Sequence, residues 1–289
     1  MKQHISSSAL VAFALLLSSS QGPAQTVYTP YTFATLAGYV YSGGDDGFGL
    51  NARFYLPAGV ALDGEGILYV ADSSNHTIRK VTPAGDVTTL AGLAGSPGTS
   101  DGVGSGARFR NPSGVVVDSS GNVFVTDMSN YTIRKVTPWG EVTTVAGLPG
   151  QPGSDDGFGN NARFDLPNDI AIDSSDNLYV TDTRKSTIRR VTQAGDVSTL
   201  AGLAGSIGAV DGLGADARFN YPELLTSDSA GNLFVADSGN HTIRKISPDG
   251  AVTTLAGMPG QAGSEDGPDR KSTRLNSSHE LKSRMPSSA

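Results

Sequence analysis

The chain contains no cysteine, and it has only four histidines and one tryptophan among its 289 residues. Without cysteine, no disulfide framework can form. So few histidines leave little basis for a Ser-His-Asp arrangement, and the glycine-rich stretches lack the lysine and the strand-to-helix context of a phosphate-binding loop. We therefore predict no catalytic residue and expect no cofactor.

The sequence also lacks a hydrophobic run long enough to span a bilayer, which requires about 20 apolar residues. Its longest apolar stretch, Ala9 to Leu17, follows a basic residue and precedes the small residues Gly22 and Ala24. This order, with a cleavage point near Gln25, is typical of a secretory signal peptide. We therefore predict a signal peptide over residues 1–24, no membrane insertion, and a secreted or periplasmic bacterial protein.

Basic residues are in deficit, because 21 Lys and Arg stand against 28 Asp and Glu, a net charge of −7 at pH 7. Binding to a phosphate backbone requires clustered Lys and Arg. An acidic, exported domain is therefore not expected to bind nucleic acid.

What the sequence does have is a strict internal repeat of 55 residues. Aligning the Asp-Gly dipeptides places Gly47, Gly102, Gly157, Gly212 and Gly267 at equal intervals. The phrases Ala-Arg-Phe and Thr-Ile-Arg recur at the same interval, as does the Asp that closes each Val-Ala-Asp or Val-Thr-Asp. Four complete units follow one another without insertion or deletion, which is typical of a repeat architecture.

Each unit contains four segments with the composition of short strands, and the second unit shows them well. Gly114 to Asp118 is an apolar run expected of a strand buried on both faces. Turn-forming residues separate it from strands at 123–127 and 132–136 and from a more polar one at 141–147. Such four-stranded units predict an all-β protein, a β-propeller. Its blades would span about residues 42–95, 96–150, 151–205 and 206–260.

The additional length of each unit lies in a glycine-rich phrase between the fourth strand and the next first strand. Because the phrase recurs at a fixed spacing, we expect it to be ordered. Gly-Ala-Arg-Phe is predicted to form a short helical turn that ends at Pro112 and inserts Phe109 between blades. The same prediction applies to Phe54, Phe164 and Phe219.

These motifs carry a resemblance to a known family. The second unit includes NPSGVVVDSSGNVFVTDMSNYTIRKVTP, residues 111–138, which resembles the NHL repeat. With the added TLAG, DG and ARF phrase, the chain is similar over about residues 32–267 to a long-blade variant of secreted bacterial proteins and to the teneurin propeller. The resemblance implies a propeller that typically has six blades.

An incomplete unit stands at each end of the propeller region. Tyr31 to Gly38 matches the fourth strand alone, and in propellers of the resembled kind such an orphan strand closes the ring against the last blade. A fifth unit breaks off after Gly267, and residues 268–289 resemble a translated adaptor or vector sequence. We therefore expect an incomplete propeller over residues 25–267, a fragment of a six-bladed ring, followed by a non-native tail. A native disordered extension is the alternative for the tail.

Two charged positions recur in every unit and are interpreted as structural, because a catalytic site is normally asymmetric. The aspartates are expected to accept N–H bonds from turns, and the arginines to clamp the loop between blades. These residues are Asp72, Asp127, Asp182 and Asp237, with Arg53, Arg108, Arg163 and Arg218.

The Asp-Gly dipeptides raise the question of calcium, which favours clustered oxygen ligands. Asp46, Asp101, Asp156 and Asp211 recur, but a second carboxylate does not accompany every one of them. A turn or helix-cap aspartate is therefore the favoured interpretation, and no metal site is expected.

Candidate binding residues are sought where the units differ, at the start of the first strand and in the turn after the second strand. The candidates are Asn168, Asp169, Glu223, His76, Tyr131, Arg184, Lys185 and His241, with Trp139 of an outer turn as a further contact residue. The histidines are expected to be solvated surface residues. Drift between duplicated loops is the alternative explanation for these differences.

Two functions remain open on the sequence. The favoured one is a non-enzymatic, exported scaffold that binds a protein or a glycan on a propeller face. The alternative is a metal-dependent hydrolase or lyase of the lactonase type, whose propeller holds a metal in its central channel. Only Asn168, Asp169 and Glu223 are candidate ligands for that metal, and the alternative rests on an analogy of fold.

Overall fold

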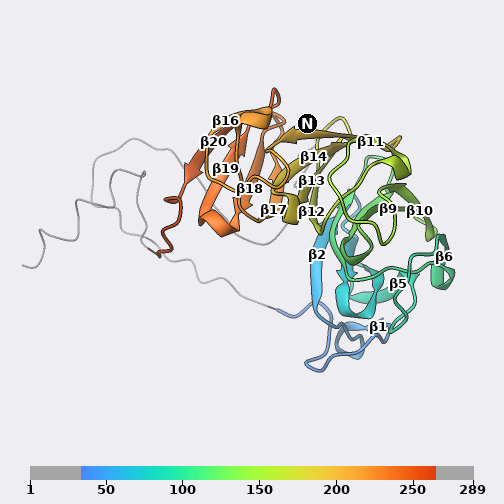
Figure 1. Ribbon diagram of the computed structural model, residues 1–289. Coiled ribbons are helices and arrows are strands. Elements are labelled where there is room, and N and C mark those ends of the chain that lie inside the picture. Colours follow the sequence, from blue (N-terminus) through green and yellow to red (C-terminus); the bar gives the residue numbers. More distant parts are fainter. Residues whose placement is uncertain (1–33, 265–289) are drawn as a thin grey trace, which may run out of the picture.

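The computed structural model describes residues 34–264, which form four β-sheets with the same strand order (Figure 1). Blade one comprises β1 (Gly47–Phe48), β2 (Pro57–Leu62), β3 (Leu68–Asp72), β4 (Thr77–Val81) and β5 (Asp86–Gly92). Blade two comprises β6 (Gly102–Val103), β7 (Pro112–Val117), β8 (Val123–Asp127), β9 (Thr132–Val136) and β10 (Glu141–Ala146). Blade three comprises β11 (Gly157–Phe158), β12 (Pro167–Ile172), β13 (Leu178–Asp182), β14 (Thr187–Val191) and β15 (Asp196–Ala201). Blade four comprises β16 (Gly212–Leu213), β17 (Pro222–Ser227), β18 (Leu233–Asp237), β19 (Thr242–Ile246) and β20 (Ala251–Ala256). The predicted all-β propeller architecture is confirmed.

Each blade is built from antiparallel hairpins between consecutive long strands. In blade two, Val125 of β8 lies opposite Val115 of β7 on one side and opposite Arg134 of β9 on the other. All five residues of β8 are buried, as expected for a strand covered on both faces. The register shifts between Pro112 and Val115, so a β-bulge stands at the start of each first strand and bends it locally.

The turn after the second long strand is a single 3₁₀ turn in every blade. These turns are η2 (Ser73–Asn75), η4 (Met128–Asn130), η6 (Thr183–Lys185) and η8 (Ser238–Asn240). The residue after each turn is left-handed, with φ of 60° at His76, 63° at Tyr131, 57° at Ser186 and 58° at His241. A non-glycine residue seldom adopts this conformation. Because this left-handed conformation recurs, the side chain after the turn projects from the same place in every blade.

The glycine-rich phrase is ordered, but it differs from the prediction in two ways. Each sheet has a fifth strand of two residues, as where Gly102 and Val103 pair with the start of β10. The helical turn precedes Ala-Arg-Phe and does not include it, since η3 (Gly104–Gly106) ends before Ala107. Equivalent turns are η1 (Gly49–Asn51), η5 (Gly159–Asn161) and η7 (Gly214–Asp216). Pairing across the sheet edge explains the order, and hydrophobic periodicity alone does not reveal it.

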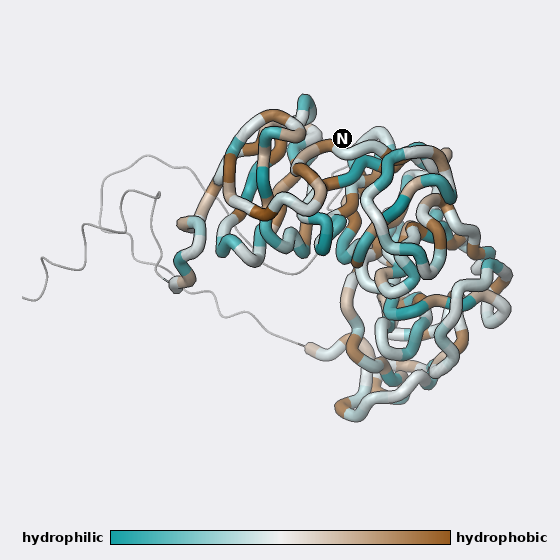
Figure 2. Tube along the Cα trace, viewed as in Figure 1, coloured by the Kyte–Doolittle hydropathy of each residue, from teal (hydrophilic) through white to brown (hydrophobic). Residues whose placement is uncertain are grey.

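The blades pack face to face around an axis lined by the first long strands, β2, β7, β12 and β17, which contact one another in chain order. Phe109 is inserted between blades as predicted. It is fully buried in a cluster that joins Ala71 and Ile78 of blade one to Val123 of blade two. Phe164 and Phe219 lie in the corresponding clusters of the next two interfaces. Figure 2 shows hydrophobic stretches in every blade, as face-to-face packing requires.

The four blades of residues 34–264 form an open arc, so within this range no further blade packs on one face of blade one or on one face of blade four (Figure 1). On blade one, Phe54 is half-buried, whereas its three counterparts are fully buried. On blade four, Ile243 is 41% exposed, whereas the equivalent Ile133 is fully buried. The same residue types therefore change from core to surface at the two ends of the arc.

Residues 34–38 lie on the free face of blade one in the place of a fourth strand from a preceding blade. The Gly38 N–H donates to the Gly49 carbonyl oxygen over 3.1 Å, and the same bond joins blade two to blade three at the equivalent position. Ala37 packs against the small cluster that Ala52 shares with Phe54. These residues are not paired as a regular strand, but they occupy the position predicted for the orphan strand.

The predicted signal peptide (residues 1–24) and the predicted non-native tail (residues 268–289) lie outside the described residues. Between residues 34 and 264, the structure contains no helix whose length and hydrophobicity would let it cross a membrane.

Candidate functional site: the channel mouth

Hairpin pairing gives the propeller two ends, and most of the candidate residues gather at one of them. Pro57 lies opposite Asp72, and Asp72 lies opposite Thr77, so the first strand begins where the second strand turns. We call this end the channel mouth. It consists of residues 55–59 and 73–76 of blade one and their equivalents in the other blades. The hairpin turns at residues 63–67 and 82–85 lie at the opposite end.

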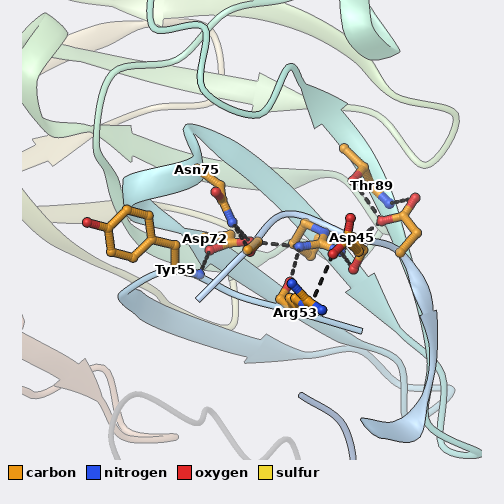
Figure 3. A network of polar contacts seen from close by, with 9 residues as sticks. Asp45, Arg53, Tyr55, Asp72, Asn75 and Thr89 are labelled. Atoms are coloured by element: carbon orange, nitrogen blue, oxygen red, sulfur yellow. Dashed lines mark hydrogen bonds and ion pairs between the residues drawn. The ribbon is translucent and has the colours of Figure 1, made fainter. Parts of the chain in front are cut away.

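A buried network of charged residues lies beneath the mouth in every blade, and Figure 3 shows it in blade one. The Asp72 carboxylate accepts hydrogen bonds from the Tyr55 N–H at 2.7 Å, from the Asn75 amide at 2.8 Å and from the Arg79 guanidinium at 2.7 Å. Arg79 also donates to the Arg53 carbonyl oxygen at 2.9 Å. Asp72 and Arg79 thus tie two strands to the phrase that precedes the first strand.

Arg79 is fully buried and reaches a second carboxylate. Its other terminal nitrogen donates to Asp46 at 2.8 Å, and Asp46 also accepts from the N–H and the hydroxyl of Thr89. The guanidinium lies 5.0 Å from the centre of the Phe54 ring, within the range of a cation–π interaction. A buried charge is tolerated when it is paired and hydrogen-bonded, and the two terminal nitrogens of Arg79 satisfy this condition, whereas its buried Nε has no hydrogen-bond partner.

The same ion pair recurs with nearly the same geometry in all four blades. The shortest N–O distances are 2.7, 2.8, 3.0 and 2.9 Å from blade one to blade four. The pairs are Asp72–Arg79, Asp127–Arg134, Asp182–Arg189 and Asp237–Arg244. Each aspartate accepts a backbone N–H from the segment before the first strand and the guanidinium of its arginine. In blades one, two and four it also accepts an asparagine amide. The turn N–H groups that were predicted as donors do not take part. The structural role of these aspartates stays a prediction.

The arginines of Ala-Arg-Phe are not the ones that hold this network. Arg163 is half-buried and donates to carbonyl oxygens of its own phrase, including that of Ala162 at 2.8 Å. Arg108 and Arg218 make the equivalent bonds, and Arg53 pairs with exposed Asp45. Sequence analysis missed the buried arginine of Thr-Ile-Arg. Its recurrence at the same strand position in all four units was the available signal for a structural charge.

The aspartates of the Asp-Gly dipeptides are not turn or helix-cap residues, so that prediction is wrong. No side chain caps the adjacent 3₁₀ turns. Asp101, for example, accepts from Arg134 at 2.7 Å and from the Thr144 hydroxyl at 3.0 Å. Asp46, Asp156 and Asp211 do the same in their own blades. These carboxylates belong to the buried-arginine network, which sequence spacing alone does not bring together.

A hollow of about 290 Å³ opens at the mouth between the first strands. Gly59 and Gly114 line it from blades one and two, Asn168 and Asp169 from blade three, and Leu224 from blade four. Position 114 requires glycine because Asp169 of blade three approaches its backbone closely. A Cβ at this position would lie 2.7 Å from a carboxylate oxygen of Asp169. The polar side of the hollow comes from Asn168 and Asp169 of blade three and from Ser113 of blade two.

Asp169 is a buried carboxyl group without a cationic partner. It is 5% exposed, and its carboxylate accepts the N–H of Leu225 in blade four at 3.0 Å. No Lys, Arg or His pairs with it among the ion pairs of residues 34–264. Burial raises the pKa of Asp169 to about 6, although backbone N–H donors oppose the shift. A carboxyl group with this environment is a marker of a functional position.

Asn168 and Glu223 lie near Asp169 and make hydrogen bonds that link blades two, three and four. The Asn168 side-chain oxygen accepts from the Ser113 hydroxyl of blade two at 2.9 Å. Its amide donates to the Glu223 carbonyl oxygen of blade four at 3.3 Å. The exposed Glu223 carboxylate accepts from the Ser238 hydroxyl at 2.9 Å. The structure thus brings together the three residues that sequence analysis singled out on the first strands.

Arg184 and Lys185 stand on the rim of the mouth in blade three. Arg184 lies 3.5 Å from Asp165 and Lys185 lies 3.2 Å from it, measured between charged atoms. Asp165 is buried and was missed by sequence analysis. Its position is held by Tyr55, Arg110 and Asn220 in the other blades, and that variation was the available signal.

The two histidines of the repeat differ from each other, and the prediction that both are solvated is wrong for His76. His76 is half-buried, and its Nδ1 accepts the N–H of Asn111 in blade two at 3.1 Å. Burial lowers the pKa of His76, and the nearby charge of Arg110 lowers it further. His241 is exposed on the free face of blade four, and Tyr131 holds the equivalent place in blade two. His76 therefore contributes a contact between blades one and two.

Trp139 lies away from the mouth. It stands in the turn between β9 and β10, at the opposite end of blade two, and is 73% exposed. It therefore cannot contribute to the same contact surface as Asn168 and Asp169.

The described part of the chain, residues 34–264, has no group of three or more His, Cys, Asp or Glu side chains placed to hold a metal ion. At the mouth, a backbone N–H occupies one oxygen of Asp169, and a serine hydroxyl bonds the Glu223 carboxylate. The chemistry of the mouth is that of a hydrogen-bond acceptor surface beside an apolar residue, Leu224.

Comparisons with known proteins agree with this architecture. Residues 95–288 match the family model of the teneurin NHL domain, and residues 54–81 match that of the NHL repeat. The chain belongs to the NHL-repeat propeller family. Teneurin-3 of Mus musculus is 30% identical over 231 residues, which cover 71% of this chain and 8% of that protein. NHL repeat-containing protein 2 of Homo sapiens is 30% identical over 249 residues, covering 74% of this chain and 34% of that protein. This NHL chain thus spans about a third or less of the length of these relatives.

Solved structures share the fold of this NHL propeller. An auxiliary nutrient binding protein from Bacteroides ovatus superposes with a TM-score of 0.54 at 23% identity, covering 71% of this chain and 50% of that one. A streptogramin B lyase superposes with a TM-score of 0.51 at 16% identity, covering 73% of this chain and 57% of that one. At these identities the likeness establishes a common propeller architecture.

Proposed function

We propose that this NHL propeller is an exported, non-enzymatic scaffold that binds a protein or glycan ligand at the channel mouth. One observation carries the proposal. The four blades share the same buried network, yet at the mouth each blade presents different side chains around one hollow. Ligands dock on loops that a rigid scaffold positions, and the mouth has that arrangement.

The mouth has the chemistry of a site for hydrogen-bond donors. The Asp169 carboxyl and the Asn168 amide meet Leu224 across the hollow, so polar and apolar contacts converge on the same group. Sugar hydroxyls beside a C–H face, or a peptide N–H beside an apolar side chain, match this combination. A volume of about 290 Å³ lies at the low end for a small-molecule pocket. The ligand is therefore a chain that places one unit in the hollow and extends along the rim.

Several findings support an exported binding role. The predicted signal peptide and the absence of cysteine agree with an envelope or secreted protein. The acidic composition disfavours nucleic acid as the partner. A protein of the same fold is named for nutrient binding, which makes a binding function a natural first test.

The experiment is a binding screen of the full chain against a glycan array and against proteins of the producing cell's surface. Each positive ligand is then compared on three proteins: the original chain, the double variant Asn168→Ala/Glu223→Ala, and the control Trp139→Ala at the opposite end. We expect the double variant to lose at least tenfold in affinity, about 1.4 kcal/mol, with little change in melting temperature. The Trp139 variant should bind as the original does.

The opposite pattern, with binding lost at Trp139 and kept in the double variant, would refute the mouth as the ligand site. The lactonase-type alternative is tested on the same preparations by metal analysis. One tightly bound metal per chain, lost in Asp169→Asn, would replace the scaffold proposal with the enzymatic one.

A further inference from the structure

One buried aspartate of the propeller differs from the others in its partners. Seven aspartates are buried between residues 34 and 264. The seventh, Asp169, has only backbone N–H donors, those of Leu225 and Ile170. A buried carboxylate requires a partner, and Asp169 lacks the kind that the others have. Those others accept a side-chain hydrogen bond or pair with a cation, and they are Asp72, Asp118, Asp127, Asp165, Asp182 and Asp237.

Contact between blades does not require a carboxyl group at this place. The equivalent positions hold Gly59 in blade one, Gly114 in blade two and Leu224 in blade four. Between blades one and two, the atoms that a Cβ on Gly59 would meet all belong to the backbone of residues 113–115. Backbone atoms alone therefore close that joint, and the carboxyl group of blade three serves another purpose.

The Asp169 carboxyl borders the hollow at the channel mouth. Its Oδ2 accepts the Leu225 N–H at 3.0 Å, whereas its Oδ1 lies over Gly114, which lines the hollow. The Ser113 carbonyl oxygen lies over Gly59 in the same way, and Gly59 lines the hollow too. Oxygen acceptors from two adjacent blades thus border one space of about 290 Å³.

No cation of the described chain neutralises this carboxyl group. The elements packed against β12 are β7, β8, β13, β17 and η6, and none of their charged side chains lines the hollow. Because nothing offsets its desolvation, the pKa of Asp169 is raised to about 6. The charged groups of these elements bond elsewhere: Asp127 and Asp182 to buried arginines, Glu223 to Ser238, and Arg184 and Lys185 to Asp165.

The other walls of the hollow are apolar. They are formed by Ala58, Val60, Val115 and Leu224. A sugar unit would place hydroxyl groups against these walls, and each hydroxyl without a partner costs free energy. A lysine side chain suits them better, because its unbranched methylene stem packs on apolar surface and its ammonium group carries three N–H donors.

We propose that the hollow binds the ammonium group of a lysine side chain on a partner protein, with the ammonium on the Asp169 carboxylate and the stem along the apolar walls. The inference rests on the proposed function, since it names the group that the mouth ligand places in the hollow. The partner supplies the cation that no described residue brings to Asp169. The net charge of −7 also attracts a basic partner at longer range.

The test titrates a Gly-Lys-Gly peptide, blocked at both ends, into the isotopically labelled full chain. We expect saturable chemical-shift changes at the amides of Gly114, Asp169 and Leu225. The same peptide acetylated on the lysine Nζ should bind at least about tenfold more weakly, because acetylation removes the charge. Glucosamine, which carries an ammonium group without a methylene stem, should also bind more weakly than the lysine peptide.

The pH dependence of binding isolates the contact with Asp169. Affinity for the lysine peptide should fall about tenfold from pH 7.5 to pH 5, because Asp169 becomes protonated below its pKa of about 6 while lysine keeps its charge. In Asp169→Asn, affinity should be reduced at pH 7.5 and should no longer vary over this range. Glu65→Gln, which removes an exposed carboxyl at the opposite end of blade one, is the matched control and should bind as the original chain does.

Equal binding of the free and acetylated peptides, or a pH dependence that persists in Asp169→Asn, would overturn the inference. Tighter binding of glucosamine than of the lysine peptide would overturn the choice of lysine. If the lysine peptide fails while a ligand from the binding screen still depends on Asn168 and Glu223, the inference is wrong and the proposed function stands. If neither shifts the amides at the mouth, both are wrong. Melting curves show whether each variant is folded.

Discussion

The buried ion-pair layer and the channel mouth above it are built on the same strands but follow opposite rules. In the layer, every blade has the same arginine between the same two aspartates, at N–O distances of 2.6–3.0 Å. At the mouth, the equivalent positions hold glycine, aspartate or leucine, and only blade three supplies a buried carboxyl group. In this NHL propeller, residues that repeat in every blade therefore form the scaffold, and positions that depart from the repeat are where function is sought.

The two regions also differ in what a substitution leaves behind. Removing an arginine from the layer leaves one fully buried and one half-exposed carboxylate without their cation. Removing Asn168 or Glu223 at the mouth leaves partners that are partly exposed to solvent. Large losses of stability are therefore expected in the layer and small ones at the mouth.

The largest effect is expected for Arg189→Ala in the layer. Asp182 would remain buried without its cation, so the free energy of unfolding should fall by about 3–5 kcal/mol. Urea denaturation measures the change. Arg190→Ala, one residue further along β14 and exposed, is the control and should cost less than about 0.5 kcal/mol. Equal losses in the two variants would contradict the structural role of the layer.

Phe164→Ala should follow, with a loss of about 3–4 kcal/mol from a fully buried ring between blades two and three. The matched change Phe54→Ala, on the free face of blade one, should cost about 1–2 kcal/mol because that ring is half-buried. Denaturation of both variants under one set of conditions sharpens the contrast between a filled interface and an open one. Similar losses would show that the free face of blade one is covered in solution.

These contrasts also show how far sequence can go. The 55-residue period predicted the blades and the burial of Phe109, because a repeated unit must bury its apolar faces against copies of itself. The fifth strand of two residues is too short to carry any periodicity. The role of Arg79 depends on Asp46 and Asp72, which lie 33 and 7 residues away in sequence and meet only when the phrase folds onto the sheet.

The candidate site was predictable in part for the same physical reason. Differences between units pointed to Asn168, Asp169 and Glu223, which the fold brings to one rim. Trp139 was grouped with them because a sequence does not show at which end of a blade a turn lies. The acidic partner of Arg184 and Lys185, Asp165, escaped notice because ion pairing was not part of the repeat comparison.

A pH-dependent effect is expected for Asp169→Asn at the mouth. The folded protein holds a proton on Asp169 up to a pKa of about 6, above the ordinary value of 3.8. This group therefore stabilises the fold fully below pH 4, and its contribution is lost as the pH rises through 6. Relative to the original chain, Asp169→Asn should gain about 2–3 kcal/mol in stability between pH 4 and pH 7.5. A stability difference that does not change with pH would contradict the buried, unpaired state of this carboxyl group.

A smaller effect is expected for Arg163→Ala in the phrase before blade three. The Arg163 side chain donates to the Asn160 and Ala162 carbonyl oxygens. It also packs tightly on Gly153, because a Cβ added to Gly153 would lie 2.7 Å from the Arg163 Cβ. Loss of these two hydrogen bonds from the partly exposed guanidinium, and of this packing, should cost about 1 kcal/mol in urea denaturation. If Arg163→Ala does not lower the free energy of unfolding, this arginine has no clamping role. A loss as large as that of Arg189→Ala would show that it is as important to stability as the buried arginines.

The smallest effect is expected for Trp139→Ala, whose side chain is largely exposed at the opposite end of blade two. Its free energy of unfolding should stay within about 0.5 kcal/mol of the original value. A larger loss would show that this end of the propeller is packed against something in solution.

The central claim, that this NHL propeller binds its ligand at the channel mouth, is tested most directly by a crystal structure with a ligand from the binding screen. We expect ligand density in the hollow beside Asn168, Asp169 and Leu224, with a donor group against the Asp169 carboxyl. Density at the opposite end, around Trp139, with the mouth unchanged, would contradict it.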